Sequence, residues 1–149
     1  MSNSYKNVPD EMCVMIDNLP IEQPITGIVY RVSKSGIIDE GTFDNTYCEM
    51  LNGTTGLKKD LSEPGTYSTS VYLTPDSCFK FINFLAKKHR DKYPSPAVIF
   101  GEICYSDGRA QLTTERIQNY PEPVHVDWWI YTGKESEVAK RFNYYVAGE

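Results

Sequence analysis

The sequence predicts an α+β domain, on the basis of three segments with strand character, one strongly apolar helix and a composition rich in aromatic residues. The strand segments are 27–33, 97–105 and 125–131, and the helix spans 77–89. Aromatic residues make up 13% of the chain and include 11 tyrosines, which favours strands and binding surfaces. With 149 residues, the chain is long enough for one domain with its own core and too short for two ordinary ones.

Residues 1–26 are expected to form an N-terminal arm, and residues 27–149 the single domain on which the arm lies. The arm is polar and carries three prolines, and only Met12, Val14, Met15 and Ile16 offer a short helical turn. The domain begins with the strand at 27–33, which has a glycine at its start and Lys-Ser-Gly at its end. Residues 36–64 are rich in turn residues and predict loops and short elements.

A strand is predicted over 67–74, and it runs directly into the helix. Because alternate side chains of a strand point to opposite faces, Ser68, Ser70 and Tyr72 form a hydroxyl-lined face. The opposite face is core-like, with Thr69 and Val71 among its members. Such a strip suits a small polar ligand if other strands bring complementary chemistry beside it.

The helix at 77–89 has recognisable start and stop signals. Pro75 suits the first turn, and apolar residues recur at helical spacing on a broad face. Basic residues crowd the last turn, where they complement the helix dipole, and prolines follow. We expect this helix to be well buried.

The second half of the chain carries further strand signals. The near-continuous apolarity of 97–105 predicts a central strand that is buried on both faces, and 110–114 is a further candidate strand. In 125–131, His125, Asp127 and Trp129 share one face, opposite three apolar residues. Residues 134–146 fit either an amphipathic helix or a closing strand.

Composition narrows the class of function. A net charge of −5 and a pI near 5.1 argue against non-specific binding to nucleic acid or to an anionic membrane. No run approaches the roughly 18 apolar residues that a membrane span requires. The 4 cysteines lack the close pairing of zinc sites, so we expect free thiols, no metal site and a cytoplasmic location.

The polar strand faces predict a ligand cleft if they meet. Arg31 would supply a fixed cation, the strip from Ser68 to Tyr72 hydroxyl groups, and Asp127 a carboxylate. A guanidinium pairs well with phosphate, hydroxyls orient a sugar or an amide, and aromatic rings stack on a base. Together these groups favour a phosphate-bearing nucleotide.

The order of these features resembles the ADP-ribosyltransferase superfamily over about residues 27–133. Tyr30-Arg31 resembles the first motif of that family, Ser68-Thr69-Ser70 the second, and His125-Val126-Asp127 takes the place of the third. The third motif normally ends in Glu, which is one methylene longer than Asp127. Glu102 and Glu115 are rival carboxylates, but neither lies at the late-strand position.

This resemblance implies a split, mostly antiparallel sheet with a cleft for NAD and possible transfer of ADP-ribose to a macromolecule. It implies that Arg31 contacts a phosphate and that the Ser68-Thr69-Ser70 motif holds the nicotinamide ribose region. Tyr72 would stack on the ligand, and Asp127 would polarise a ribose hydroxyl or the acceptor. His125, whose ordinary pKa suits acid–base work, would act beside Asp127.

A second reading is a non-catalytic, acidic binding protein that masks a protein partner, of the immunity or anti-defence type. Small size, acidic charge and many aromatic residues are typical of such factors, because tyrosine and tryptophan often anchor interfaces. In this reading Trp128 belongs to the core. Trp129, on the opposite face, is the candidate anchor, or in the nucleotide reading a stacking surface.

Overall fold

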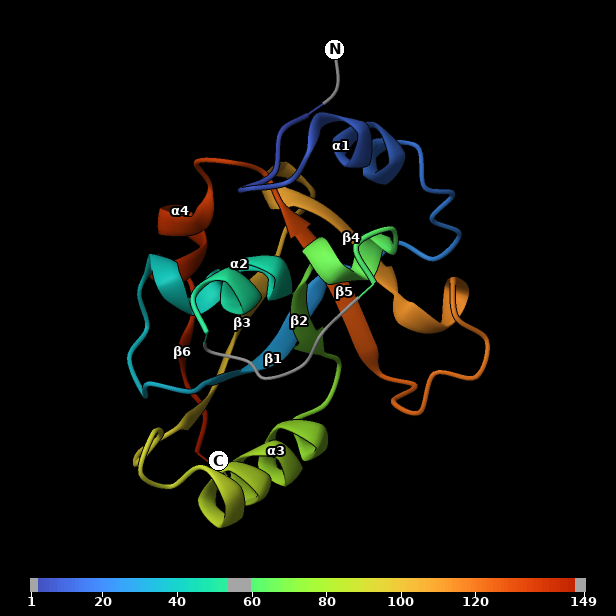
Figure 1. Ribbon diagram of the computed structural model, residues 1–149. Helices are drawn as coiled ribbons and strands as arrows, with labels where there is room; N and C mark the ends of the chain where they lie inside the picture. Colours follow the sequence, from blue (N-terminus) through green and yellow to red (C-terminus); the bar gives the residue numbers. More distant parts are fainter. Residues whose placement is uncertain (1–2, 54–59, 147–149) are drawn as a thin grey trace.

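The computed structural model describes residues 3–53 and 60–146, which form a six-stranded antiparallel sheet surrounded by short helices (Figure 1). The strands, in sequence order, are β1 Gly27–Ser33, β2 Thr69–Tyr72, β3 Ala97–Ile103, β4 Gly108–Leu112, β5 His125–Ile130 and β6 Asn143–Tyr144. The α-helices are α1 Asp10–Asp17, α2 Thr46–Leu51, α3 Asp76–Lys88 and α4 Glu135–Lys140. Four 3-10 turns complete the described elements: η1 Glu40–Phe43, η2 Pro64–Tyr67, η3 Tyr105–Asp107 and η4 Thr113–Glu115. The predicted α+β class is confirmed.

The sheet divides into two halves between its central strands. Its order is β4-β5-β2-β1-β3-β6, and every pairing is antiparallel. β1 and β3 pair along the whole of both strands, whereas β1 and β2 pair only at Tyr30 and Tyr72. Beyond that pair the two strands separate, and side chains of both strands line a cavity between the halves.

Two hydrophobic clusters lie on opposite faces of the sheet. One contains Val126 and Trp128 of β5 and is covered by Phe43 of η1 and Val138 of α4. The other contains Trp129 of β5, which packs against α1 and η2. Because successive residues of β5 point to opposite faces, this one strand contributes to both clusters.

Two strand predictions need correction. β2 begins at Thr69 rather than at residue 67, because Tyr67 ends the 3-10 turn η2 and packs in the cluster with Trp129. β3 is not central but second from one edge, between β1 and β6, and Glu102 is exposed. Its apolar sequence reflects a core on one face and aromatic packing around Phe100 on the other.

The helix α3 is less buried than its sequence predicts. It lies at the periphery of the molecule, against β1 and β3 (Figure 1). Only Ser77, Cys78 and Leu85 are buried, and Phe84 is 46% exposed. The apolar face is wider than the surface the sheet offers, so the helix is half-buried.

The ends of the domain form short elements. Residues 134–146 contain both of the structures that their sequence allows, α4 followed by the two-residue strand β6. In the N-terminal segment, Met12, Cys13 and Ile16 of α1 are buried in the cluster with Trp129. This segment therefore completes part of the core.

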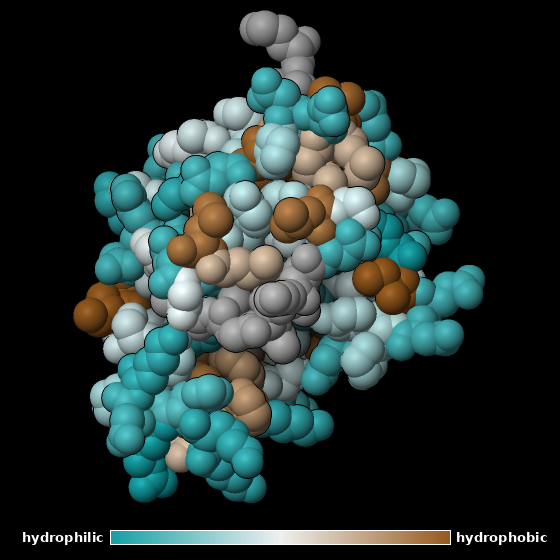
Figure 2. Space-filling view, viewed as in Figure 1, coloured by the Kyte–Doolittle hydropathy of each residue, from teal (hydrophilic) through white to brown (hydrophobic). Residues whose placement is uncertain are grey.

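Among the described residues, no helix has the length and apolarity needed to cross a bilayer. On the face shown in Figure 2, apolar side chains form separated patches within a polar surface. Scattered exposed hydrophobic residues are normal for globular proteins and need no partner.

Candidate functional site

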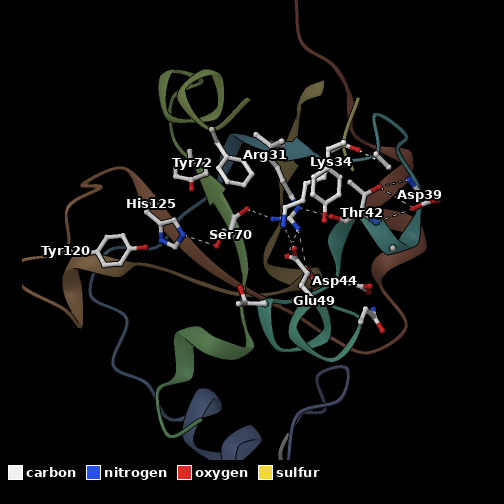
Figure 3. A pocket seen from close by; sticks show the side chains of 18 residues that line it. Arg31, Lys34, Asp39, Thr42, Asp44, Glu49, Ser70, Tyr72, Tyr120 and His125 are labelled. Carbon is white, nitrogen blue, oxygen red and sulfur yellow. Dashed lines mark hydrogen bonds and ion pairs between the residues drawn. The ribbon is translucent and has the colours of Figure 1, made fainter. Parts of the chain in front are cut away.

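A cavity of about 410 Å³ lies where β1 and β2 separate (Figure 3). Its walls come from the end of β1, from β2, from the first residue of β5, and from η1, α2 and α3. Four of the predicted ligand residues line it: Arg31, Ser70, Tyr72 and His125. This volume falls within the range of pockets that bury small organic ligands.

Arg31 joins the two halves of the sheet at the base of this cavity. Its Nε donates to the carbonyl of Thr42 at 2.8 Å, and its Nη1 donates to the carbonyl of Ser70 at 2.7 Å. Nη2 lies 3.4 Å from the carbonyl of Asp44 and 3.6 Å from the carboxylate of Glu49. Arg31 is only 9% exposed, so most of its hydrogen-bonding capacity holds the cavity walls in place.

Ser70 and Tyr72 point from β2 toward His125 on the neighbouring strand. The register pairs Tyr72 with His125 and Ser70 with Asp127, as expected for residues that share one face. Ser70 Oγ lies 2.9 Å from His125 Nε2. The Tyr72 and His125 rings contact each other edge to face, with 5.2 Å between the ring centres. The predicted hydroxyl strip therefore meets the predicted histidine in the cavity.

His125 is hydrogen-bonded through both ring nitrogens. Besides the contact with Ser70, its Nδ1 lies 2.5 Å from Thr113 Oγ1. The Thr113 hydroxyl donates its proton to Asp127 Oδ2 at 3.0 Å, so toward His125 it acts as acceptor. A neutral His125 consequently carries its proton on Nδ1, and Nε2 accepts the hydroxyl proton of Ser70.

Asp127 lies behind His125, away from the cavity. It is 2% exposed and accepts hydrogen bonds from Ser68 Oγ at 2.7 Å and from Thr113, and it pairs with Arg116 at 2.8 Å. Direct contact between Asp127 and a ligand is therefore not possible in this arrangement. The expectation that it polarises a ribose hydroxyl is corrected, for reasons of position rather than of length.

Three other predicted ligand residues belong to the interior. Ser68 is fully buried and donates a hydrogen bond to Asp127, and Thr69 donates one to the carbonyl of Phe43 at 2.7 Å. Trp129 is fully buried, and its Nε1 donates to the carbonyl of Pro64. The prediction that Trp129 offers a stacking surface or an interface anchor is wrong, because η2 and α1 cover that face of β5.

The rival carboxylates also lie elsewhere. Glu115 accepts from the backbone nitrogens of Glu22 and Gln23, where it fastens the end of the N-terminal segment to η4. Glu102 is exposed on β3 and does not line the cavity. Neither of these carboxylates lines the cavity.

Several residues of the site could not be identified from the sequence pattern. Tyr120, Tyr93 and Phe81 add aromatic rings to the cavity, and Lys34 adds a second cation. Tyr120 comes from the irregular segment before β5, where two prolines mark only a loop. Its hydroxyl points toward His125 in Figure 3, and the two rings lie 5.1 Å apart.

The cavity has an aromatic and mildly acidic lining. Among the described lining residues, Asp39, Asp44 and Glu49 supply carboxylates, and Arg31 and Lys34 supply cations. Glu49 pairs with both cations, at 3.6 Å and 3.0 Å. The balance is less favourable to a pyrophosphate than the sequence implied.

Burial also determines the state of the two phenols near His125. It raises the pKa of Tyr72 and of Tyr120 above the ordinary value of 10.0. Both hydroxyls stay protonated near neutral pH and remain hydrogen-bond donors. The site therefore offers a serine, an imidazole and two neutral phenols around one small space.

Within the part of the chain that the structure describes, no cluster of three or more His, Cys, Asp or Glu side chains could hold a metal ion. Comparison with known proteins adds no assignment: no protein family, no characterised protein and no solved structure matches the chain. The geometry of the cavity is therefore the basis for a functional assignment.

Proposed function

We propose that the cavity between β1 and β2 binds the nicotinamide ribose part of NAD, or a related nucleotide, in a protein of ADP-ribosyltransferase-like architecture. One observation carries the proposal. Arg31, Ser70 and His125 come from three strands, and they converge on one cavity at the place where the antiparallel sheet divides. The order of motifs in the sequence led us to expect such a convergence.

The lining supports the nicotinamide end of the ligand rather than its phosphates. The oxidised nicotinamide ring carries a positive charge, which is attracted to aromatic faces and to carboxylates. Tyr72, Tyr120 and Phe81 supply such faces, and Glu49 and Asp44 supply carboxylates. A reduced ring has no positive charge, and we expect it to bind less tightly.

Transfer of ADP-ribose to an acceptor would require a carboxylate near the ribose to stabilise the positive charge that develops there. Asp127 is buried behind His125, where it is held by hydrogen bonds and an ion pair, and it does not line the cavity. Glu49, in contrast, is a lining residue. Any transfer would therefore depend on one of the carboxylates that line the cavity, which are Asp39, Asp44 and Glu49. Ligand binding is the part of the proposal that the site supports most directly.

Calorimetric titration with oxidised NAD, reduced NAD, nicotinamide riboside and AMP tests the proposal. We expect oxidised NAD and nicotinamide riboside to bind, with the reduced form weaker by about tenfold, the effect of one cation–π interaction. Absence of binding by oxidised NAD at millimolar concentration would refute the proposal. Preferential binding of AMP would refute the orientation.

Variants on the cavity wall locate the binding. Tyr120→Leu removes one aromatic face of the cavity and should lower the affinity for oxidised NAD by about tenfold. Tyr105→Leu is the matched control, because Tyr105 is 65% exposed and does not line this cavity. Equal affinities of the two variants would place the ligand elsewhere.

A further inference from the structure

We infer that Ser70 is a nucleophile activated by His125, and that this pair catalyses acyl transfer from a small carboxylic ester to water. Thr113 and Asp127 are positioning residues that act through His125. The inference goes beyond the proposed nucleotide ligand and does not rest on it. It follows from a continuous series of hydrogen bonds between four side chains, in the order Ser70, His125, Thr113 and Asp127.

The direction of each proton in this chain is determined at its buried end. Asp127, as a carboxylate, can only accept, and Thr113 has one proton to donate. Thr113 Oγ1 therefore accepts from His125 Nδ1, which leaves Nε2 with its lone pair toward Ser70 Oγ at 2.9 Å. This is the tautomer that a general base needs beside a serine nucleophile.

The buried end of the chain is held firmly. Asp127 receives hydrogen bonds from Ser68 and Thr113 and an ion pair from Arg116, and its side chain is 3% exposed. Its Oδ1 also lies 3.9 Å from His125 Nδ1, close enough to stabilise an imidazolium as it forms. Asp127 thus has an electrostatic role in the reaction without reaching the substrate.

The reacting end of the chain opens on the cavity. Ser70 is partly exposed and lines the space, whereas His125 is 6% exposed and is shielded by Tyr72 and Tyr120. Figure 3 shows Ser70 between His125 and Arg31. The neutral phenols of Tyr72 and Tyr120 line the same cavity, and they are the hydrogen-bond donors that we expect to stabilise the charge that develops on a substrate oxygen.

The reaction balances with water as the only co-reactant. Ser70 Oγ attacks the ester carbonyl carbon while its proton moves to His125 Nε2. The bond from carbon to the leaving oxygen then breaks, and His125 returns the proton to that oxygen. His125 next removes a proton from water, the hydroxide attacks the acyl-serine, and Ser70 recovers its proton as the acid leaves.

A fluorophosphonate probe tests the inference on the intact protein. Attack by Ser70 forms an oxygen–phosphorus bond and expels fluoride, and mass spectrometry of the intact chain and its peptides locates the adduct. We expect one adduct per chain, on Ser70, and none in Ser70→Ala. His125→Gln should slow labelling by about a hundredfold, the lower range of general-base catalysis.

Two further comparisons separate activation from folding. Thr113→Val removes the hydroxyl that orients His125 and should slow labelling, whereas Thr113→Ser keeps that hydroxyl and should label at a rate close to wild type. Ser62→Ala is the matched control, because Ser62 donates to the carboxylate of Asp60 at 2.6 Å and lies outside the cavity. It should leave labelling unchanged, and thermal unfolding confirms that each variant is folded.

The labelled position decides the outcome. An adduct on Ser70 that depends on both His125 and the Thr113 hydroxyl supports the inference. An adduct on another residue, absence of an adduct, or equal labelling of wild type and folded His125→Gln overturns it. Calorimetry with NAD is a separate measurement, so a negative result in one experiment does not decide the other proposal.

Discussion

Arg116 and Asp127 form a buried ion pair, with Arg116 Nη2 2.8 Å from Asp127 Oδ2 and side-chain exposures of 13% and 3%. The same guanidinium contacts Glu63 and lies over the Trp129 ring at 5.5 Å from its centre. Burial alone lowers the pKa of Arg116, but the neighbouring Asp127 and Glu63 carboxylates raise it above its ordinary value. This contact gives the buried Asp127 carboxylate a charge partner behind His125.

Removal of Arg116 should therefore destabilise the fold. Arg116→Met leaves Asp127 buried without its charge partner, and breaking such a pair costs about 3–5 kcal/mol. Urea unfolding at neutral pH measures the change. Lys134→Met is the matched control: it breaks the exposed pair with Glu137 and should cost less than about 1 kcal/mol. Equal losses in the two variants would show that the Arg116 pair is weak.

Arg31 should contribute to stability as well as to the cavity. Its guanidinium, carried by β1, bridges the carbonyl of Thr42 in η1 and that of Ser70 in β2, across the division in the sheet. Arg31→Ala leaves these carbonyls without a donor and should cost about 2–3 kcal/mol in unfolding free energy. Arg31→Lys should recover only part of that, because an ammonium cannot reproduce the planar fork.

Arg90→Ala is the control for the loss of one positive charge, since Arg90 is exposed beyond the end of α3. We expect its unfolding free energy to stay within about 0.5 kcal/mol of wild type. If Arg31→Ala behaved in the same way, the bridging role of Arg31 would be wrong. Because substitution of Arg31 is expected to destabilise the fold, ligand binding at the cavity is better tested with a Tyr120 variant than with an Arg31 variant.

Gly108 is required by the approach of β4 to β5. A Cβ built on Gly108 would lie 1.9 Å from the backbone oxygen of Trp129, whereas on Gly41 the nearest contact is 3.4 Å. Gly108→Ala therefore forces the two strands apart and should cost about 1–3 kcal/mol or more. Gly41→Ala should leave stability nearly unchanged in the same thermal-unfolding measurement. A stable Gly108→Ala protein would contradict the pairing of β4 with β5.

The sequence predicts the site only where it lies on regular strands. Alternation alone places Ser70 and Tyr72 on one face of β2, and His125 and Asp127 on one face of β5. Thr113 and Arg116, which contact the Asp127 carboxylate, come from η4 and the residue after it. A 3-10 turn has no extended period, so no pattern indicates which of its side chains turn inward.

Trp129 shows the same limit for the fold. Its alternation with Trp128 is correct, and Trp128 belongs to the core as predicted. Alternation cannot tell that the other face of β5 is also covered, because the cover comes from α1 and η2, far away in the sequence. The half-buried state of α3 has a similar cause, since burial depends on the width of the sheet beneath it.

Cys78 provides a test by pH. It is fully buried against the sheet, and burial raises the pKa of its thiol from 9.0 to about 12. In the unfolded chain the thiol ionises above pH 9, whereas in the folded chain it stays protonated until about pH 12. The stability linked to this thiol is therefore complete below pH 9 and is lost as the pH rises from 9 to 12.

We expect wild type to lose more unfolding free energy than Cys78→Ala between pH 8 and pH 10, by about 1.4 kcal/mol. Burial also raises the pKa of Tyr5 and Tyr72, which adds a background of the same sign to both proteins. The difference between the two urea-unfolding series removes this background and any pH-independent cost of the smaller side chain. Parallel curves for the two proteins would show that Cys78 ionises as readily in the folded state as in the unfolded chain, which its complete burial should prevent.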